Sequence, residues 1–314
     1  MRIAILGPGG VGGLLAGLLE RSGNEVTVVA SESTAALINE RGIRITSVTF
    51  GDFVARPPAV ARLELPTDAL IVATKSAGLE PALERIATEP PLVLPLLNGL
   101  DHIALLRRRF APSSVIAGSI RVEADRPEPG VVLHTSPFLL VSMAGAEPAM
   151  AGAIERLGQA LERAGVPSKV LDSEAQVMWS KLVRLNALAC TTSAYDKLLG
   201  EIRDTPALRA DLLGAIEEAS AVGRAEGASD VDAARAMAEL EAAHATLGSS
   251  MQRDIAAGRE PELDAIPGSV LRAGARHGIA CPTIERLVVL IATRAGIDPP
   301  RAGARARAAP PLEG

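Results

Sequence analysis

The chain has 314 residues, which is long enough for two domains with a large buried core. Hydrophobic residues make up 48% and charged residues 22%, a globular composition that excludes intrinsic disorder. The net charge is −5, with acidic and basic residues mixed along the chain, which excludes the basic footprint of a nucleic-acid-binding protein.

The cysteines and the hydropathy pattern indicate the compartment. Cys190 and Cys281 are too few for a disulfide framework, and we expect both to be small core residues and no metal site. No apolar stretch reaches membrane-spanning length, and the chain starts on a strand pattern instead of a signal sequence. The sequence therefore predicts a cytoplasmic protein without membrane or nucleic-acid partners, and it is compatible with a homodimer.

A strand, a glycine turn and a helix open the chain. Residues 2–6 form an apolar run suited to one buried parallel strand, and residues 14–21 have the pattern of a helix. Between them, Gly7, Gly9 and Gly12 have the G-x-G-x-x-G spacing of a dinucleotide-binding turn, in which the helix N-terminus faces the phosphates. The predicted dinucleotide contacts in this turn are Gly7, Gly9, Gly10, Val11 and Gly12.

The second strand, residues 25–30, ends where nucleotide-binding folds hold the adenosine ribose. An acidic side chain there selects NAD and a basic one selects NADP, but this chain continues Ser31-Glu32-Ser33-Thr34. The hydroxyls of Ser31, Ser33 and Thr34 can hold a phosphate, whereas Glu32 would repel one. An equally good interpretation is that Ser33 or Thr34 caps the following helix.

Two more buried strands, residues 68–75 and 91–97, lead to polar side chains. Ligands of open α/β sheets bind beyond the carboxyl ends of strands, so Lys75 is well placed for cofactor phosphates, although a solvated strand-end lysine is the alternative. Asn98-Gly99 alone is an ordinary turn pair. Because two strand ends offer polar groups to one edge of the sheet, the pattern favours an active-site asparagine.

The pattern changes near residue 171. Before it, further strands are expected at 42–45, 50–55, 115–120, 131–135, 138–142 and 167–171, with helices at 35–41, 79–87 and 148–164. After it, only helices are expected, at 173–197, 206–226, 230–247, 263–277 and 284–295. We therefore predict an α/β, Rossmann-like dinucleotide-binding domain in residues 1–171, an all-α substrate and catalytic domain in 172–298, and a disordered tail in 299–314.

Two stretches of the helical domain carry candidate chemistry. Lys181 lies beside Trp179 in a largely apolar helix, where burial would make it a candidate general acid; the alternative is an ammonium that reaches solvent. Residues 249–264 are unusually polar and carry Ser250 and Glu262, although the helix dipole alone can explain Glu262. Spacing by itself leaves these residues undecided.

These stretches together resemble the ketopantoate reductase family over nearly the whole chain, up to about residue 295. The resemblance is carried by the turn at 3–12, by Ala73-Thr74-Lys75, by Leu97-Asn98-Gly99, and by Trp179-Ser180-Lys181-Leu182 together with Ser249-Ser250-Met251, Asp254 and Glu262. It implies a nucleotide-binding sheet followed by a helical domain. It also implies reduction of 2-dehydropantoate to pantoate with NADPH, on the way to pantothenate and coenzyme A.

The resemblance also implies roles for single residues. Lys181 would protonate the substrate carbonyl oxygen as hydride arrives from the nicotinamide, and Glu262 would orient or tune that lysine. Asn98 would hydrogen-bond the reacting substrate, and Ser250 would hold its carboxylate end. The implied cofactor contacts outside the glycine turn are Ser31, Lys75 and Asn98.

Departures from the family pattern keep two alternatives in view. Leu185 and Ala189 stand where the family usually has asparagines, and Asn186 is displaced by about 100° around the helix. Ser31 stands in place of the usual arginine, which leaves NADH as an alternative cofactor, and Pro267-Gly268 replaces the common Asn-Gly. A different 2-oxoacid is therefore one alternative function, and a non-catalytic nucleotide sensor is the other.

Overall fold

The structure is a computed structural model that describes residues 1–300, and its chain divides into two compact units. Unit 1 comprises Met1–Leu97 and Leu105–Val177; unit 2 comprises Asn98–Ala104 and the chain from Met178 onward. The predicted fold class is confirmed, because unit 1 is built on a parallel sheet and the helices α6 to α12 follow it. The predicted tail lies outside the described residues except for Pro299 and Pro300.

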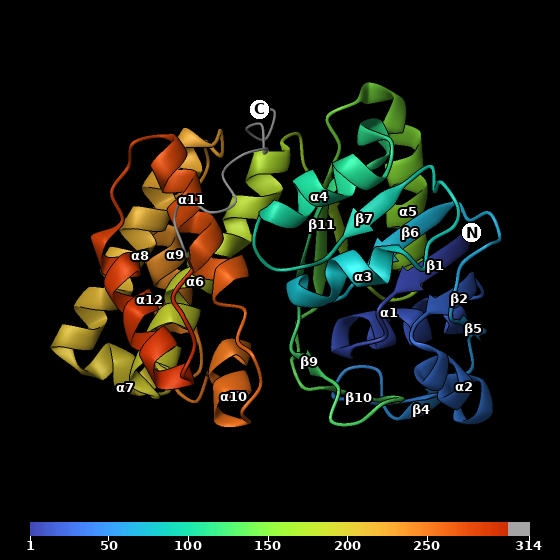
Figure 1. The fold of residues 1–314 in the computed structure, drawn as a ribbon, viewed down its shortest axis with the longest axis horizontal. Coiled ribbons are helices and arrows are strands. Elements are labelled where there is room, and N and C mark those ends of the chain that lie inside the picture. Colours follow the sequence, from blue (N-terminus) through green and yellow to red (C-terminus); the bar gives the residue numbers. More distant parts are fainter. Residues whose placement is uncertain (301–314) are drawn as a thin grey trace. The chain divides into compact units, whose positions relative to one another are not determined.

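The main sheet of unit 1 has five parallel strands in the order β5-β2-β1-β6-β7 (Figure 1). The chain leaves β1 on one side through β2 and β5 and then occupies the other side through β6 and β7. This reversal makes a topological switch point beside β1, where open α/β sheets bind their ligands. The strands are β1 (Arg2–Leu6), β2 (Glu25–Val29), β5 (Ala59–Val60), β6 (Ala69–Val72) and β7 (Val93–Pro95).

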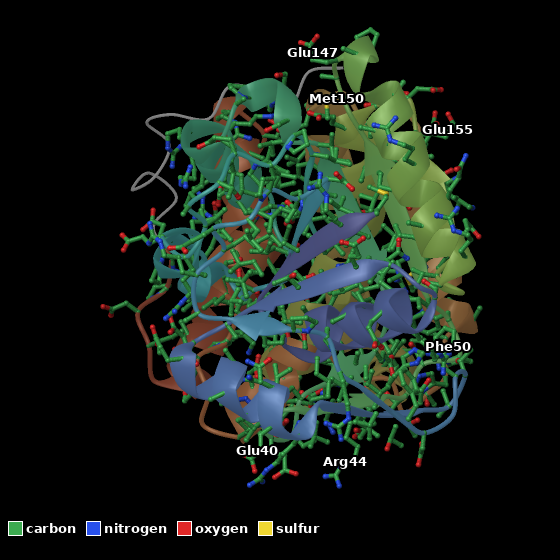
Figure 2. The ribbon with its side chains drawn as sticks, turned by 90° about the vertical axis from the view of Figure 1, so that its right-hand side faces the viewer. Glu40, Arg44, Phe50, Glu147, Met150 and Glu155 are labelled. Atoms are coloured by element: carbon green, nitrogen blue, oxygen red, sulfur yellow. The ribbon has the colours of Figure 1, made fainter. Side chains whose placement is uncertain are left out.

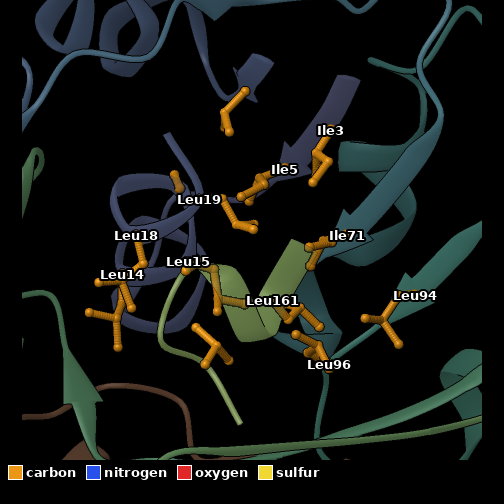
Figure 3. Close-up of a cluster of buried hydrophobic side chains, with 14 of the residues drawn as sticks. Ile3, Ile5, Leu14, Leu15, Leu18, Leu19, Ile71, Leu94, Leu96 and Leu161 are labelled. Carbon is orange, nitrogen blue, oxygen red and sulfur yellow. The ribbon is translucent and has the colours of Figure 1, made fainter. Parts of the chain in front are cut away.

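The sheet is buried on both faces, as the unbroken apolar run of its first strand predicts. Successive side chains of a strand point to opposite faces, so Ile3 and Ile5 enter one apolar cluster while Ala4 and Leu6 enter another. Each large side chain buried in this way contributes about 1.5–3 kcal/mol to the free energy of unfolding. Helix α1 (Gly10–Arg21) covers the isoleucine side with Leu14, Leu15, Leu18 and Leu19 (Figure 3).

Two smaller sheets complete unit 1, with the orders β4-β3-β10-β9 and β12-β11-β8. The predicted pair at 42–45 and 50–55 is confirmed as β3 and β4, which are antiparallel. Their strands are β3 (Ile43–Ser47), β4 (Phe53–Ala55), β8 (Ala117–Arg121), β9 (Ala124–Asp125), β10 (Val131–His134), β11 (Leu140–Ala144) and β12 (Ser168–Val170). The helices are α2 (Glu32–Arg41), α3 (Leu79–Leu83), α5 (Ala151–Arg163), η1 (Ser76–Gly78), η2 (Pro112–Ser114) and η3 (Pro148–Met150).

The outer surface of unit 1 is charged. Glu40, Arg44, Glu147 and Glu155 are exposed and project from the ribbon (Figure 2). Phe50 is partly buried and is stacked on the ring of His134 with 5.9 Å between the centroids. These four charges are therefore screened by solvent, whereas the Phe50 ring is used for packing.

Unit 2 is organised around α8 (Pro206–Ala225), which packs against α7, α9, α11 and α12. Trp179 is fully buried and lies on Gly223 of α8, where an added Cβ would be 3.1 Å from the indole ring. Cys190 and Cys281 are buried and unpaired, as expected for core residues. The other helices are α6 (Glu174–Tyr195), α7 (Leu199–Asp204), α9 (Ala233–Ala242), α10 (Ser250–Ala256), η4 (Asp264–Gly268), α11 (Ser269–Arg276) and α12 (Pro282–Ala295).

Helix α4 (Asp101–Arg109), which directly follows the Asn98-Gly99 turn, was not predicted, and neither was α7. Helix α4 is only nine residues long and ends in three successive arginines, and its apolar side is short, with Ile103 and Leu106 buried. Across residues 1–300, none of the helices combines the length and the apolar character needed to cross a membrane.

Candidate active site

The glycine turn of unit 1 has the backbone geometry that its spacing predicts. Gly7 has a φ of +91°, a conformation that side chains disfavour. A Cβ at Gly12 would lie 2.1 Å from the Gly7 carbonyl oxygen, and one at Gly10 would lie 2.2 Å from the carbonyl oxygen of Ala124. At Gly9 the nearest atom outside the turn would be 3.9 Å away, so the backbone there is open to the close approach of a ligand.

The N-terminus of α1 supplies the donors for that ligand. Gly9 is the N-cap of the helix, and in the described chain no side chain caps it. The first N–H groups of a helix lack intrahelical acceptors and carry partial positive charge, so those of Gly10, Val11 and Gly12 suit an anion. The open backbone at Gly9 and these donors fit the pyrophosphate of a dinucleotide.

The segment after β2 differs from one expectation. Ser31, and not Ser33 or Thr34, is the N-cap of α2, because the helix already begins at Glu32. The Thr34 N–H donates to Ser31 Oγ at 3.3 Å. Glu32 is exposed and forms an ion pair with Arg85, with 3.4 Å between Oε1 and Nη1. A basic group therefore lies beside this segment, although sequence offered none at the strand end.

Lys75 also lies beyond a strand end, that of β6. The β6 edge is joined to β1 by the Ala73 N–H, which donates to the Leu6 carbonyl oxygen at 2.9 Å. Thr74 then approaches the glycine turn so closely that a Cβ on Gly7 would be 2.7 Å from its side-chain methyl group. Lys75 follows Thr74 directly in the chain, and its side chain is exposed.

The three residues predicted to be catalytic are joined by hydrogen bonds within unit 2, and we call them the Asn98 network. Lys181 Nζ donates to Asn98 Oδ1 at 2.8 Å, and Asn98 Nδ2 donates to Glu262 Oε2 at 2.9 Å. All three side chains are half-buried. Because an ammonium can only donate and a carboxylate can only accept, these partners determine which end of the amide faces the lysine.

Gly99 explains how Asn98 reaches Glu262. It has a φ of +82°, and a Cβ on it would lie 1.9 Å from the carbonyl oxygen of Ala265. Only glycine permits so close a contact. Since Ala265 follows Glu262 by three positions, the contact brings the segment of Asn98 close to the segment of Glu262. The Asn-Gly pair is therefore a turn and also a packing site.

Glu262 precedes a π-helical turn, η4, whereas the sequence predicted one continuous helix at 263–277. Pro267 lacks an N–H and cannot donate to the carbonyl of Leu263, so the next residue does so instead: the Gly268 N–H lies 3.1 Å from the Leu263 oxygen. Turns of this kind occur often at functional sites. Pro267 is the one sign of this turn in the sequence, where Pro267-Gly268 replaces the family's common Asn-Gly.

A buried guanidinium lies next to the network. The Arg272 side chain is 3% exposed, and it bonds Asp101 Oδ2 at 2.5 Å and Asp264 Oδ1 at 2.7 Å. Burial pulls the pKa of Arg272 down, but the charges of Asp101 and Asp264 outweigh it, so that pKa lies above its ordinary value. Sequence reasoning missed these residues, because their partners are far apart along the chain.

His102 is a second titratable group that sequence reasoning missed. Its ring is buried, and within the described chain neither ring nitrogen has a hydrogen-bond partner. Burial, assisted by the charge of Lys181, lowers the pKa of His102 to about 3. The imidazole is therefore uncharged at neutral pH, and it adds no second cation beside the lysine.

The positions expected to contact the substrate give a mixed picture. Ser250 is the exposed first residue of α10, while its neighbour Ser249 is buried and accepts a hydrogen bond from Thr192 at 2.8 Å. On α6, Leu185 is half-buried and Ala189 is fully buried. The helix around these two positions is regular, so the displaced asparagine at 186 does not take their place.

These features define a class: a dinucleotide-binding α/β unit and a helical unit whose lysine, amide and carboxylate suit proton donation to a carbonyl. Two family descriptions match the chain, "Ketopantoate reductase PanE/ApbA" over residues 3–142 and "Ketopantoate reductase PanE/ApbA C terminal" over residues 175–295. The chain belongs to the ketopantoate reductase family. It is an oxidoreductase that acts on a 2-oxoacid, in a family that binds a nicotinamide cofactor.

Individual relatives agree with this assignment. The 2-dehydropantoate 2-reductase of Caulobacter vibrioides is 30% identical, over 92% of this chain and 97% of the relative. The structure of 2-dehydropantoate 2-reductase from Geobacter metallireducens has a TM-score of 0.85 at 27% identity, covering 93% of this chain and 99% of that one. A ternary structure of D-mandelate dehydrogenase with NADH and anilino(oxo)acetate has a TM-score of 0.86 at 23% identity, covering 94% and 98%, and shows the same fold.

The glycine turn can be tested by two matched substitutions. We expect Gly9→Val to fold normally and to weaken nucleotide binding about 100-fold, since blocked charge-assisted hydrogen bonds to a phosphate are worth ~3 kcal/mol. Gly12→Val should instead lower the free energy of unfolding by about 3 kcal/mol, because its side chain meets the Gly7 backbone. Calorimetric titration and urea unfolding measure the two effects; unchanged nucleotide affinity in Gly9→Val would contradict the assignment.

His102 predicts an acid-sensitive stability. Its pKa is about 3 in the folded chain against an ordinary 6.5, so the unfolded chain binds more protons between these values. This contribution is fully present above about pH 6.5 and is lost as pH falls toward 3. We expect the urea midpoint of the wild type to fall more steeply between neutral pH and about pH 4 than that of His102→Leu. Parallel pH dependence of the two proteins would refute it.

Proposed function

We propose that this chain reduces 2-dehydropantoate to pantoate with NADPH as hydride donor, a step toward pantothenate. The observation that carries the proposal is the Asn98 network, in which a lysine, an amide and a carboxylate are joined in a member of this family. The Caulobacter and Geobacter relatives, which bear the name of this activity, support the choice of substrate.

Lys181 is the proton donor in this proposal. NADPH, when bound, supplies hydride to the carbonyl carbon of the 2-oxoacid. Negative charge then develops on the carbonyl oxygen, and the ammonium of Lys181 stabilises it and delivers the proton that completes the alcohol. An ammonium has three N–H donors, and the bond to Asn98 occupies one of them.

Asn98 and Glu262 hold that donor in place. The Asn98 oxygen accepts from Lys181, and the Asn98 NH₂ group is engaged by Glu262, so the amide cannot turn over without losing both bonds. Fixing the direction of the ammonium in advance removes an orientational cost from the reaction. The negative charge of Glu262 also attracts the positively charged ammonium of Lys181.

The glycine turn would hold the pyrophosphate of the cofactor, through Gly7, Gly9, Gly10, Val11 and Gly12. Lys75 and Ser31 would be further contacts. Arg85 beside Glu32 adds a cation near the segment where a 2′-phosphate lies in this kind of fold, which supports NADPH. Ser31 is already the cap of α2 and replaces the family's usual arginine, which keeps NADH as the comparison.

A second candidate substrate is an apolar or aromatic 2-oxoacid. Leu185 and Ala189 present hydrocarbon where the family usually has asparagines, and unpaired substrate hydroxyls are costly against hydrocarbon. The fold neighbour D-mandelate dehydrogenase, whose structure holds anilino(oxo)acetate, gives an example of this substrate class on the same fold.

Turnover by the purified protein decides between these candidates. NADPH and NADH oxidation would be followed with 2-dehydropantoate and with a panel of branched and aromatic 2-oxoacids. Highest kcat/KM with 2-dehydropantoate and NADPH supports the proposal. Preference for an aromatic acid supports the second candidate. Nucleotide binding without turnover on any 2-oxoacid would overturn both.

Lys181→Ala tests the proton donor. We expect kcat to fall by about 10²–10⁴, the usual contribution of a general acid, while the Kd of NADPH changes little. Lys181→Arg is the matched control, because it keeps the charge but is a poor proton donor, and it should also be slow. If Lys181→Ala retained most of the wild-type kcat, Lys181 would not be the proton donor.

A further inference from the structure

Arg272 is an expensive residue for a fold to bury. Its side chain is 3% exposed, whereas its two partners reach solvent, with Asp101 at 39% and Asp264 at 53% exposed. A buried charge must recover its lost hydration through its contacts, and hydrophobic residues of similar size often stabilise a fold at least as well. Stability alone therefore does not account for an arginine at this position.

The placement of its partners is more informative. Asp101 follows Asn98 by three positions, and Asp264 follows Glu262 by two. Arg272 Nη2 bonds Asp101 Oδ2 at 2.5 Å and the Asp264 carbonyl oxygen at 2.9 Å, while Nη1 bonds Asp264 Oδ1 at 2.7 Å. One planar guanidinium thus joins the segment that carries Asn98 to the segment that carries Glu262.

A second contact lies between the same two segments. The Gly99 backbone meets the carbonyl of Ala265, and the Asn98–Glu262 hydrogen bond spans 2.9 Å beside it. The Gly99 contact sets how closely the segments approach, but one backbone contact leaves them able to pivot. A forked guanidinium with two carboxylate partners removes that freedom, because its donors have fixed directions.

We infer that Arg272 is a positioning residue: through Asp101 and Asp264 it holds Asn98 against Glu262 and so directs the proton of Lys181. The inference rests on the proposed function of Lys181 as proton donor. It assigns a catalytic consequence to a residue that touches neither substrate nor cofactor. A displacement near 1 Å in such a support can cost about 100-fold in rate.

The test is Arg272→Gln, alone and combined with Asn98→Ala. We expect Arg272→Gln to lower kcat by about 10- to 100-fold, with the Kd of NADPH unchanged. In the Asn98→Ala background the same change should have almost no further effect on kcat, because there is no longer an amide to position. Arg272→Lys should be intermediate, since an ammonium cannot reproduce the fork.

Arg276→Gln is the matched control. Arg276 lies on the same helix, is partly buried, and pairs with the buried carboxylate of Glu226, at a distance of 3.1 Å. Its loss should change stability but leave kcat close to that of the wild type. If Arg272→Gln does not fold, Asp101→Asn removes one partner of the guanidinium from a more exposed position, and kcat should fall several-fold.

Hydrogen exchange of the peptide spanning residues 97–104 provides a readout that needs no substrate. We expect faster exchange in Arg272→Gln, or in Asp101→Asn, than in the wild type and in Arg276→Gln. Unchanged exchange, or equal kcat losses in the wild-type and Asn98→Ala backgrounds, would overturn the inference. A wild type that turns over no 2-oxoacid would instead overturn the proposed function, and exchange alone would then decide whether Arg272 holds the segment.

Discussion

The site depends on one amide whose two ends cannot be exchanged. Asn98 accepts from an ammonium and donates to a carboxylate, and neither partner can take the opposite role. The surrounding residues serve that geometry: Gly99 allows the close approach, Pro267 produces the widened turn after Glu262, and Arg272 joins the two segments. In the proposed mechanism the proton of Lys181 must be directed before hydride arrives, and these contacts would fix its direction in advance.

Much of the fold follows from local sequence patterns. The apolar run of β1, the glycine spacing after it and the alternation of strands and helices are short-range signals, and they lead to a parallel sheet with a switch point beside β1. The change to helices alone after residue 171 is also visible in the sequence. Lys181, Asn98 and Glu262 were selected by a family resemblance, and their hydrogen bonds join positions up to 164 residues apart.

Other features depend on contacts that no local pattern records. Helix α4 is short, follows a turn pair directly and ends in consecutive arginines, so its signal in sequence is weak, yet it places Asp101 and His102. The start of α2 was placed too late, which gave the cap to Ser33 or Thr34 instead of Ser31. Arg272 has the pattern of an ordinary helix-surface arginine until its partners from two distant segments are known.

The central claim is that Lys181, Asn98 and Glu262 act as one unit, and a double-variant cycle tests it most directly. The kcat values of Asn98→Ala, of Glu262→Gln and of the protein with both changes would be compared with the wild type, with the Kd of NADPH as the control. If Glu262 acts through Asn98, the double variant should be no slower than the slower single variant. Losses that multiply would mean that the two residues act independently and would contradict the account.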